Sequence, residues 1–153
     1  MKILMVCLGN ICRSPLAEGI MKTKLLERGW PWRVDSAGTG SWHIGDLPDP
    51  RSISIARKHG IDITDQRARQ FTRHDYDAFD LIFAMDRQNY QDILRLAPNA
   101  QSREKVRLIL EAARGQHQEV PDPYYDDQGF EQVFRMLDDA CEKILLHMHP
   151  PTA

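Results

Sequence analysis

The sequence predicts an α/β fold, a doubly wound sandwich with a four-stranded parallel sheet and helices on both faces. Strand-like runs alternate with helix-like segments four times along the chain, which is the pattern of parallel strands joined by crossover helices. Residues 3–7 are continuously apolar, and residues 79–85 form a second run typical of a buried strand. Such runs are expected of strands that are covered on both faces.

The first strand is expected at residues 2–7, and a helix follows it. Ser14 and Pro15 provide an N-cap and first-turn signal, and Gly29 provides the stop signal. The apolar residues of this helix recur at helical spacing: Leu16, Ala17, Ile20, Met21 and Leu25. A short second strand is expected at residues 32–37.

The second and third helices have recognisable start signals. An Asp-Pro pair at residues 49–50 opens the second helix, which is expected to end at Gly60. The third strand is expected at residues 79–85, with Asp86 as the N-cap of a helix that runs to about Leu96.

Residues 104–110 are expected to form the fourth strand, with a helix as the alternative. The last helix has the clearest apolar stripe, and Asp127 is its expected N-cap. The stripe consists of Phe130, Val133, Phe134, Leu137, Cys141, Ile144, Leu145 and Met148. Cys141 is therefore expected in the core. Residues 1–153 are expected to form one domain, with the last few residues disordered.

The composition excludes several classes of protein. A formal net charge of -2 argues against nucleic-acid binding, and no apolar run approaches the ~18 residues of a membrane span. Three cysteines, an odd number in a chain without a secretion signal, indicate free thiols and a cytoplasmic location. The histidines have no spacing that suggests a metal. We therefore expect no metal, cofactor, nucleic acid or membrane partner.

The carboxyl ends of parallel strands form the ligand-binding edge of such a sheet. Four segments should converge there: residues 7–14, residues 36–48, Asp86 and residues 120–127. The first segment has the features of an anion site, because backbone N–H groups gather where a strand leads into a helix N-terminus. We expect Gly9 to supply a backbone conformation that other residues resist.

Two side chains suit phosphate chemistry in this loop. Arg13 offers a planar fork that binds two phosphate oxygens, and the field that attracts phosphate favours the thiolate form of Cys7. The hydroxyl of Ser14 is placed to donate a hydrogen bond to that sulfur. The residues expected to contact substrate here are Leu8, Gly9, Asn10, Ile11, Cys12 and Ser14.

A cysteine that ends an apolar strand is more often a small buried side chain than a nucleophile. A Walker-type nucleotide loop is excluded, because it needs glycines and a lysine before its Ser or Thr. The combination of Cys, five residues, Arg, Ser and Pro between a strand and a helix favours the nucleophile.

Residues 7–15, CLGNICRSP, are similar to the signature loop of the low-molecular-weight protein tyrosine phosphatases. Further stretches resemble that family in the same order: DSAGTGSW, PDPR, ARQFT, FAMDRQN and DPYYDD. The resemblance covers nearly the whole chain and is highly specific.

The resemblance implies that Cys7 is the nucleophile, Arg13 the phosphate clamp and Asp122 the general acid. It also implies hydrogen-bonding supports for the loop, and aromatic residues that shape the pocket mouth. The supports are Asn10, Ser14 and Ser36, and the aromatic residues are Trp42, Tyr124 and Tyr125. The implied substrates are tyrosine-phosphorylated proteins, with phosphate and other oxyanions as inhibitors.

Without the resemblance, the residues support Asp122 as general acid less strongly than they support Cys7 as nucleophile. Aspartates beside prolines mostly form turns, and Asp126 and Asp127 lie on the same loop as Asp122. Asp127 is read as a helix cap and Asp126 as a solvated or pocket-rim residue. Asp86 is a cap that could also brace the signature loop.

Three further interpretations stay open. A thiol-dependent arsenate reductase has a similar fold and loop, but its relay needs cysteines near the third strand, where this chain has Ala84. A non-catalytic anion-sensing module would need only the loop. Cys12 is either a packing residue or a thiol that protects an oxidised Cys7 by forming a disulfide.

Overall fold

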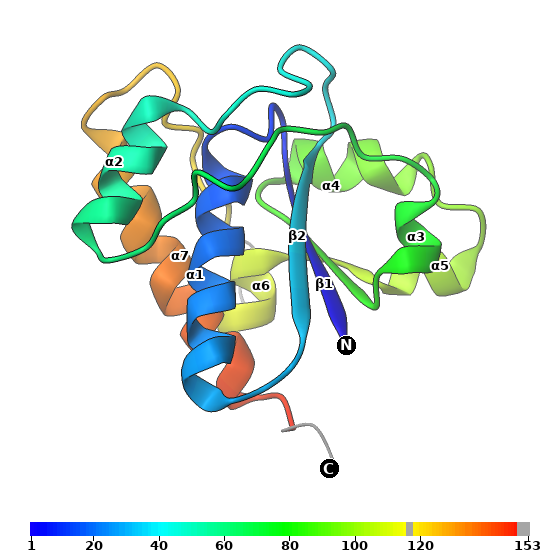
Figure 1. Cartoon of the computed structure of the whole chain (residues 1–153). Helices are drawn as coiled ribbons and strands as arrows, with labels where there is room; N and C mark the ends of the chain where they lie inside the picture. The colour runs from blue at the N-terminus through cyan, green and yellow to red at the C-terminus, as the bar shows by residue number, and fades with distance from the viewer. Residues whose placement is uncertain (116–117, 150–153) are drawn as a thin grey trace.

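The sheet has the predicted form. The computed structural model describes residues 1–115 and 118–149. Its strands are all parallel and lie in the order β2-β1-β3-β4 (Figure 1). They are β1 (Lys2–Cys7), β2 (Arg33–Gly38), β3 (Leu81–Ala84) and β4 (Val106–Leu108).

Helices cover both faces of this sheet, which confirms the predicted sandwich. One face carries α1 (Arg13–Arg28), α2 (Pro50–Lys58), α6 (Ile109–Arg114) and α7 (Gly129–Leu146). The opposite face carries α3 (Asp75–Ala78), α4 (Arg87–Leu94) and α5 (Ala100–Glu104). Because β1 lies inside the sheet, its carboxyl end opens between the two helical layers.

The side chains of β1 alternate between two cores. Ile3 and Met5 pack against α1 and α7, whereas Leu4 and Val6 pack on the face of α3 and α4. Side chains along a strand point to opposite faces in turn, so Cys7 follows Met5 on the α1 side. The strand therefore delivers Cys7 to the N-terminus of α1.

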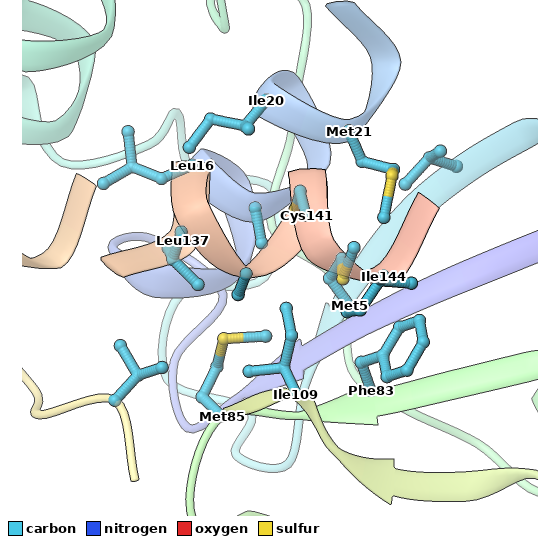
Figure 2. Packing of buried hydrophobic residues seen from close by; sticks show 14 of the residues in the cluster. Met5, Leu16, Ile20, Met21, Phe83, Met85, Ile109, Leu137, Cys141 and Ile144 are labelled. Carbon is cyan, nitrogen blue, oxygen red and sulfur yellow. The ribbon is translucent and has the colours of Figure 1, made fainter. Parts of the chain in front are cut away.

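Figure 2 shows the larger core, in which α1 and α7 pack together above the sheet. Cys141 lies fully buried between Leu137 and Ile144 on α7, which confirms its expected core position. Burial raises the pKa of the Cys141 thiol to about 12. This cysteine is therefore an inert packing residue at neutral pH.

Three predicted helix boundaries are confirmed by their hydrogen bonds. Asp49 accepts a bond from the Arg51 backbone N–H at 2.8 Å and caps α2. Asp86 accepts a bond from the Asn89 N–H at 2.8 Å and caps α4. Gly29 ends α1 with a φ of 69°, in the left-handed region that favours glycine.

Two predicted caps are wrong. Helix α1 begins at Arg13, so Ser14 lies inside it, and the Ser14 hydroxyl faces Cys7 instead of the helix amides. Helix α7 has Gln128 at its N-cap position, and Asp127 is paired with the Arg51 guanidinium at 2.6 Å. In both cases a side-chain partner outside the helix has taken the side chain away from the helix backbone.

The segment at residues 104–110 combines both alternatives. The fourth strand is only Val106–Leu108, and α6 begins at Ile109 directly after it. The short helices α3 and α5 were not predicted, because four or five residues are too few to display a helical period. Helices α2 and α4 each end about two residues before the expected position.

In the described part of the chain, no helix combines the length and apolar character needed to cross a membrane. The expected disorder of the last few residues concerns residues 150–153, which lie outside the described residues.

Candidate active site

A pocket of about 300 Å³ lies at the carboxyl end of β1. Three segments line it, and Figure 1 shows them together at one end of the molecule. They are the signature loop (residues 7–14), the Trp42 loop (residues 39–49) and the Asp122 loop (residues 120–127). The lining residues are Cys7, Leu8, Gly9, Ile11, Cys12, Arg13, Trp42, His43, Asp122, Tyr124 and Tyr125. The structure thus gathers most of the predicted site residues around one opening.

Asn10, and not Gly9, supplies the unusual backbone conformation of the signature loop. Asn10 has a φ of 59°, and it is the one residue other than glycine with a positive φ in the described ranges. Asparagine tolerates this region better than most residues. Gly9 is constrained by space, because a Cβ there would lie 3.2 Å from the His43 ring. The prediction that Gly9 supplies an unusual backbone conformation is therefore wrong, and it is the space beside His43 that constrains this position.

Hydrogen bonds on three sides hold Asn10 in this conformation. Its Oδ1 accepts a bond from the Arg69 backbone N–H at 3.0 Å. Its Nδ2 donates to Ser14 Oγ at 2.8 Å and to Ser36 Oγ at 3.0 Å. Asn10 and Ser14 are buried beneath the loop and do not line the pocket. Their side chains support the loop from below, and contact between these two residues and substrate stays a prediction.

The same bonds determine how Ser14 meets the Cys7 sulfur. The Ser36 hydroxyl donates to the buried Glu18 carboxylate at 2.7 Å, so it can only accept from Asn10. Asn10 in turn donates to Ser14, which leaves the Ser14 hydrogen free. Ser14 Oγ lies 3.0 Å from Cys7 Sγ, and we infer that it donates to the sulfur. The Asn10 backbone N–H also donates to Cys7 Sγ, at 3.3 Å.

Glu18 was missed by the sequence analysis. It lies one helical turn after Ser14 on α1, is 3% exposed and is bonded to both Ser36 and Lys22. Burial raises the pKa of Glu18, although the hydrogen bonds from Lys22 and Ser36 act in the opposite direction. A glutamate in the middle of an apolar helix face is the signal that could have revealed it.

Glu18→Gln is expected to become more stable relative to the wild type as the pH rises. Because the pKa of Glu18 is raised in the folded state, its contribution to stability is complete below about pH 4.5 and declines as pH rises through the folded pKa. Glutamine does not titrate and keeps an acceptor for Ser36. Urea unfolding of both proteins between about pH 3 and 8 measures the difference.

Glu142→Gln is the matched control for this measurement. A hydrogen bond from Arg28 is the main cause that lowers the pKa of Glu142, so its stabilising contribution is lost as pH falls. The two variants should therefore show opposite pH trends. A Glu18→Gln trend that follows that of Glu142→Gln would contradict the buried-charge account.

Arg13 forms the floor of the pocket and is almost fully buried. Its Nη1 donates to Asp86 Oδ2 at 2.6 Å and to the Val120 carbonyl at 3.0 Å. Burial alone acts to lower the pKa of Arg13, but the charge of Cys7 and the bond to Asp86 outweigh it, so the pKa is raised. Asp86 braces Arg13 with one oxygen and caps α4 with the other.

Asp122 is the carboxylate of its loop that lines the pocket. Its Oδ2 lies 3.7 Å from Arg13 Nη2, and its Oδ1 accepts the Tyr124 N–H at 3.1 Å. The two rivals point elsewhere. Asp126 accepts the Gln128 N–H within the turn, and Asp127 binds Arg51.

Aromatic side chains form the rim. Trp42 and Tyr125 are strongly exposed, and Tyr124 meets Tyr125 edge-on with ring centroids 4.9 Å apart. Gly40 leaves room for the Trp42 ring, since a Cβ there would lie 2.0 Å from it. His43 was not predicted as a site residue, yet it lines the pocket, and its Nδ1 lies 3.2 Å from Asp46 Oδ2. Its position beside Trp42 was the available signal.

Within residues 1–115 and 118–149, no group of three or more His, Cys, Asp or Glu side chains is arranged to hold a metal ion.

Comparisons with known proteins agree on one family. The model of the low molecular weight phosphotyrosine protein phosphatases matches residues 2–150. A protein of that name from Schizosaccharomyces pombe is 42% identical over 149 residues, which cover 94% of each chain. Relatives from Drosophila melanogaster and Sus scrofa carry the same family name.

Solved structures agree as well. A protein tyrosine phosphatase from Entamoeba histolytica, with Hepes in its active site, superposes with a TM-score of 0.89 at 39% identity and 95% coverage of each chain. A second match is an arginine phosphatase, solved as a cysteine-to-serine mutant with a phosphorylated active-site serine. Its TM-score is 0.86 at 27% identity, and the match covers 94% of this chain and 93% of that one. With this fold, this pocket and these relatives, the chain belongs to the low molecular weight phosphotyrosine protein phosphatase family, and it is an enzyme of the phosphatase class.

Proposed function

We propose that the protein hydrolyses phosphotyrosine in proteins through a phosphocysteine intermediate on Cys7. One observation carries the proposal: Cys7, Arg13 and Asp122 line the same pocket, although Asp122 lies more than a hundred residues further along the chain. A thiol, a buried cation and a partly exposed carboxylate are the three groups that such a reaction needs.

In the first step, Cys7 Sγ attacks phosphorus, and the bond between phosphorus and the tyrosyl oxygen breaks. Arg13 and the amides of the signature loop hold the other phosphate oxygens. The protonated carboxyl of Asp122 donates its proton to the leaving oxygen, so tyrosine departs as a neutral phenol. Asp122 is suited to this because its side chain is the most exposed of these three groups and lines the pocket.

In the second step, water attacks the phosphocysteine, and the ionised Asp122 accepts its proton. The sulfur–phosphorus bond breaks, inorganic phosphate is released and Cys7 becomes a thiolate again. Two hydrogen-bond donors, the Ser14 hydroxyl and the Asn10 N–H, face the sulfur and stabilise it as a leaving group.

The pocket lining supports a phenyl phosphate as substrate. Leu8 and Ile11 form apolar walls, and aromatic rings surround the opening. A phenyl ring fits these surfaces and carries its phosphate to the floor, where Arg13 lies. Inorganic phosphate and other oxyanions should compete for the same floor.

Substrate trapping tests the proposal. Cys7→Ser should retain tyrosine-phosphorylated proteins from a lysate, since the phosphate-binding groups remain while the nucleophile is lost. Cys7→Ser/Arg13→Ala should retain few. Equal recovery by both, or recovery of mainly phosphoserine or phosphoarginine proteins, would contradict the substrate assignment. Arsenate reduction without aryl phosphate turnover would favour the reductase alternative, and neither activity would favour the anion-sensing module.

We also propose that peroxide inactivates the enzyme reversibly through Cys7 and Cys12. Peroxide converts the Cys7 thiolate to a sulfenic acid, and the Cys12 thiol displaces water from it to form a disulfide. Cys12 is buried at the start of α1. Burial, together with the charges of Asp49 and Cys7, raises the pKa of Cys12 to about 12. Cys12 is therefore a thiol at neutral pH, which leaves Cys7 as the first site of oxidation.

Cys12→Ser is expected to recover less activity than the wild type after peroxide followed by dithiothreitol, because its Cys7 has no thiol to capture the sulfenic acid. Activity recovery and peptide mass mapping of disulfides measure this. Inorganic phosphate should slow the inactivation by occupying the pocket. Full recovery by Cys12→Ser, or the absence of a Cys7–Cys12 peptide, would make Cys12 a packing residue.

The proposal includes one phosphatase domain and a cytoplasmic location. The family match over residues 2–150 supports the first. The three cysteines are free thiols, which suits a reducing compartment.

A further inference from the structure

Arg51, near the start of α2, makes contacts that the proposed chemistry does not use. Its Nε and Nη2 bind both carboxylate oxygens of Asp49, at 3.0 and 2.9 Å. Its Nη1 donates to Asp127 at 2.6 Å. The guanidinium also lies over two rings, 5.5 Å from the centroid of Tyr124 and 4.6 Å from that of Phe130. One side chain thus joins α2, the Asp122 loop and α7.

The α2 end of this junction is attached to the signature loop. The Asp49 backbone N–H donates to the Ile11 carbonyl at 2.8 Å, and the Ser52 hydroxyl donates to the Cys12 carbonyl at 3.3 Å. The start of α2 therefore rests on the loop that contains Cys7. A group anchored there is fixed relative to the nucleophile.

The other end of the junction holds a loop with few attachments of its own. The turns of the Asp122 loop are closed by local bonds, such as the Tyr124 N–H to Asp122 and the Gln128 N–H to Asp126. Among the described residues, the bond from Arg51 to Asp127 is the one hydrogen bond that ties a side chain of residues 121–127 to another segment. Figure 1 shows this loop beside α2.

We propose that Arg51 is a positioning residue that fixes Asp122 relative to Cys7, an inference that rests on the proposed function. The ring of Tyr124, under the guanidinium, lies two residues after Asp122, and the Tyr124 amide is bonded to the Asp122 carboxylate. Movement of Tyr124 would therefore move the proton donor.

The planar shape of arginine is part of this role. Asp127 is largely exposed, and an ion pair at such a site contributes little by itself. Stacking on two rings while binding Asp49 with two donors requires a planar fork, which lysine lacks. Three of the five N–H donors of Arg51 are already bonded within the protein. The guanidinium is thus committed to internal contacts and poorly placed to recognise a substrate anion.

The first arm of the test measures phosphorylation of Cys7 by two aryl phosphates in single-turnover experiments. Phenyl phosphate needs a proton at its leaving oxygen, whereas dinitrophenyl phosphate does not. General acids contribute about 10² to 10⁴ in rate. Arg51→Ala should therefore slow phosphorylation of Cys7 by phenyl phosphate roughly tenfold, and by dinitrophenyl phosphate less than about twofold. Arg51→Lys should resemble Arg51→Ala, because it restores charge without the planar fork.

The second arm combines Arg51→Ala with Asp122→Asn. If Arg51 acts through Asp122, the double variant should be no slower on phenyl phosphate than Asp122→Asn alone. Arg114→Ala is the matched control, because Arg114 is similarly exposed and pairs with Asp139 on α7. Arg114→Ala should leave the rates on both substrates unchanged.

The third arm is independent of activity. Amide hydrogen exchange of Tyr124 and Gln128 should accelerate in Arg51→Ala and Arg51→Lys but not in Arg114→Ala. The assignment of Arg51 would be overturned by equal losses of rate on the two substrates, or by a further loss of rate when Arg51→Ala is added to Asp122→Asn. Unchanged hydrogen exchange at Tyr124 and Gln128 would overturn it as well. A wild-type protein without aryl phosphate turnover would instead overturn the proposed function. The exchange measurement would still show whether Arg51 holds the Asp122 loop in place.

Discussion

Cys7→Ser is expected to lose turnover of phosphotyrosine by at least about ten-thousandfold, the scale seen when a catalytic nucleophile is removed. The groups around the sulfur explain why serine cannot substitute. The Ser14 hydroxyl and the Asn10 N–H both donate toward position 7, and neither can remove a proton. Such donors stabilise a sulfur anion during the reaction, but they cannot create an alkoxide from serine, whose hydroxyl needs a base to remove its proton.

Initial rates on a phosphotyrosine peptide, with isothermal calorimetry of inorganic phosphate binding, measure this prediction. Phosphate should still bind, because Arg13 and the loop amides are unchanged. Cys141→Ala is the control for the loss of a thiol, since Cys141 lies in the core. A Cys7→Ser protein that keeps more than a few per cent of wild-type turnover would show that another group attacks phosphorus.

Asp122→Asn is expected to slow phosphotyrosine hydrolysis by about 10² to 10⁴. Asparagine keeps the acceptor for the Tyr124 N–H, so the loop should retain its shape. It has no acidic proton to give to the leaving phenol. The loss in the first step should be much smaller on aryl phosphates whose phenols are acidic, because these leave without a proton.

A series of aryl phosphates with leaving groups of graded pKa, each measured in a single turnover, tests this dependence. Asp126→Asn is the matched control from the same loop, since Asp126 only closes a turn there. It should show the wild-type dependence on the leaving group. Equal losses of Asp122→Asn across the series would remove the acid role from Asp122 and direct attention to the neighbouring aspartates.

The features that were predicted correctly depend on residues close together in the chain. The buried strand at residues 2–7, the caps Asp49 and Asp86 and the stop at Gly29 all arise from local rules of burial, capping and backbone conformation. The convergence of loops followed from the parallel sheet alone, since carboxyl ends of parallel strands meet at one edge.

The errors have a common physical cause. Ser14 and Asp127 have the residue types of helix caps, but Cys7 and Arg51 offered their side chains better partners. Gly9 was expected to supply the unusual backbone, yet Asn10 does so, because bonds to Arg69, Ser14 and Ser36 hold it there. Competition between the local backbone and other side-chain partners is decided only when the chain is folded.

The sequence by itself determined the sheet, the position of Cys7 before a helix N-terminus and the family to which the chain is similar. These depend on short-range patterns and on a motif whose parts lie within nine residues. The tertiary structure alone decided that Glu18 supports the signature loop from beneath, that Asp122 and not Asp126 or Asp127 reaches the pocket, and that Arg51 joins the two loops. Those contacts join residues 18 to 109 positions apart. No local pattern encodes them, since hydrogen bonds and ring contacts depend on distances that exist only after the helices have packed on the sheet.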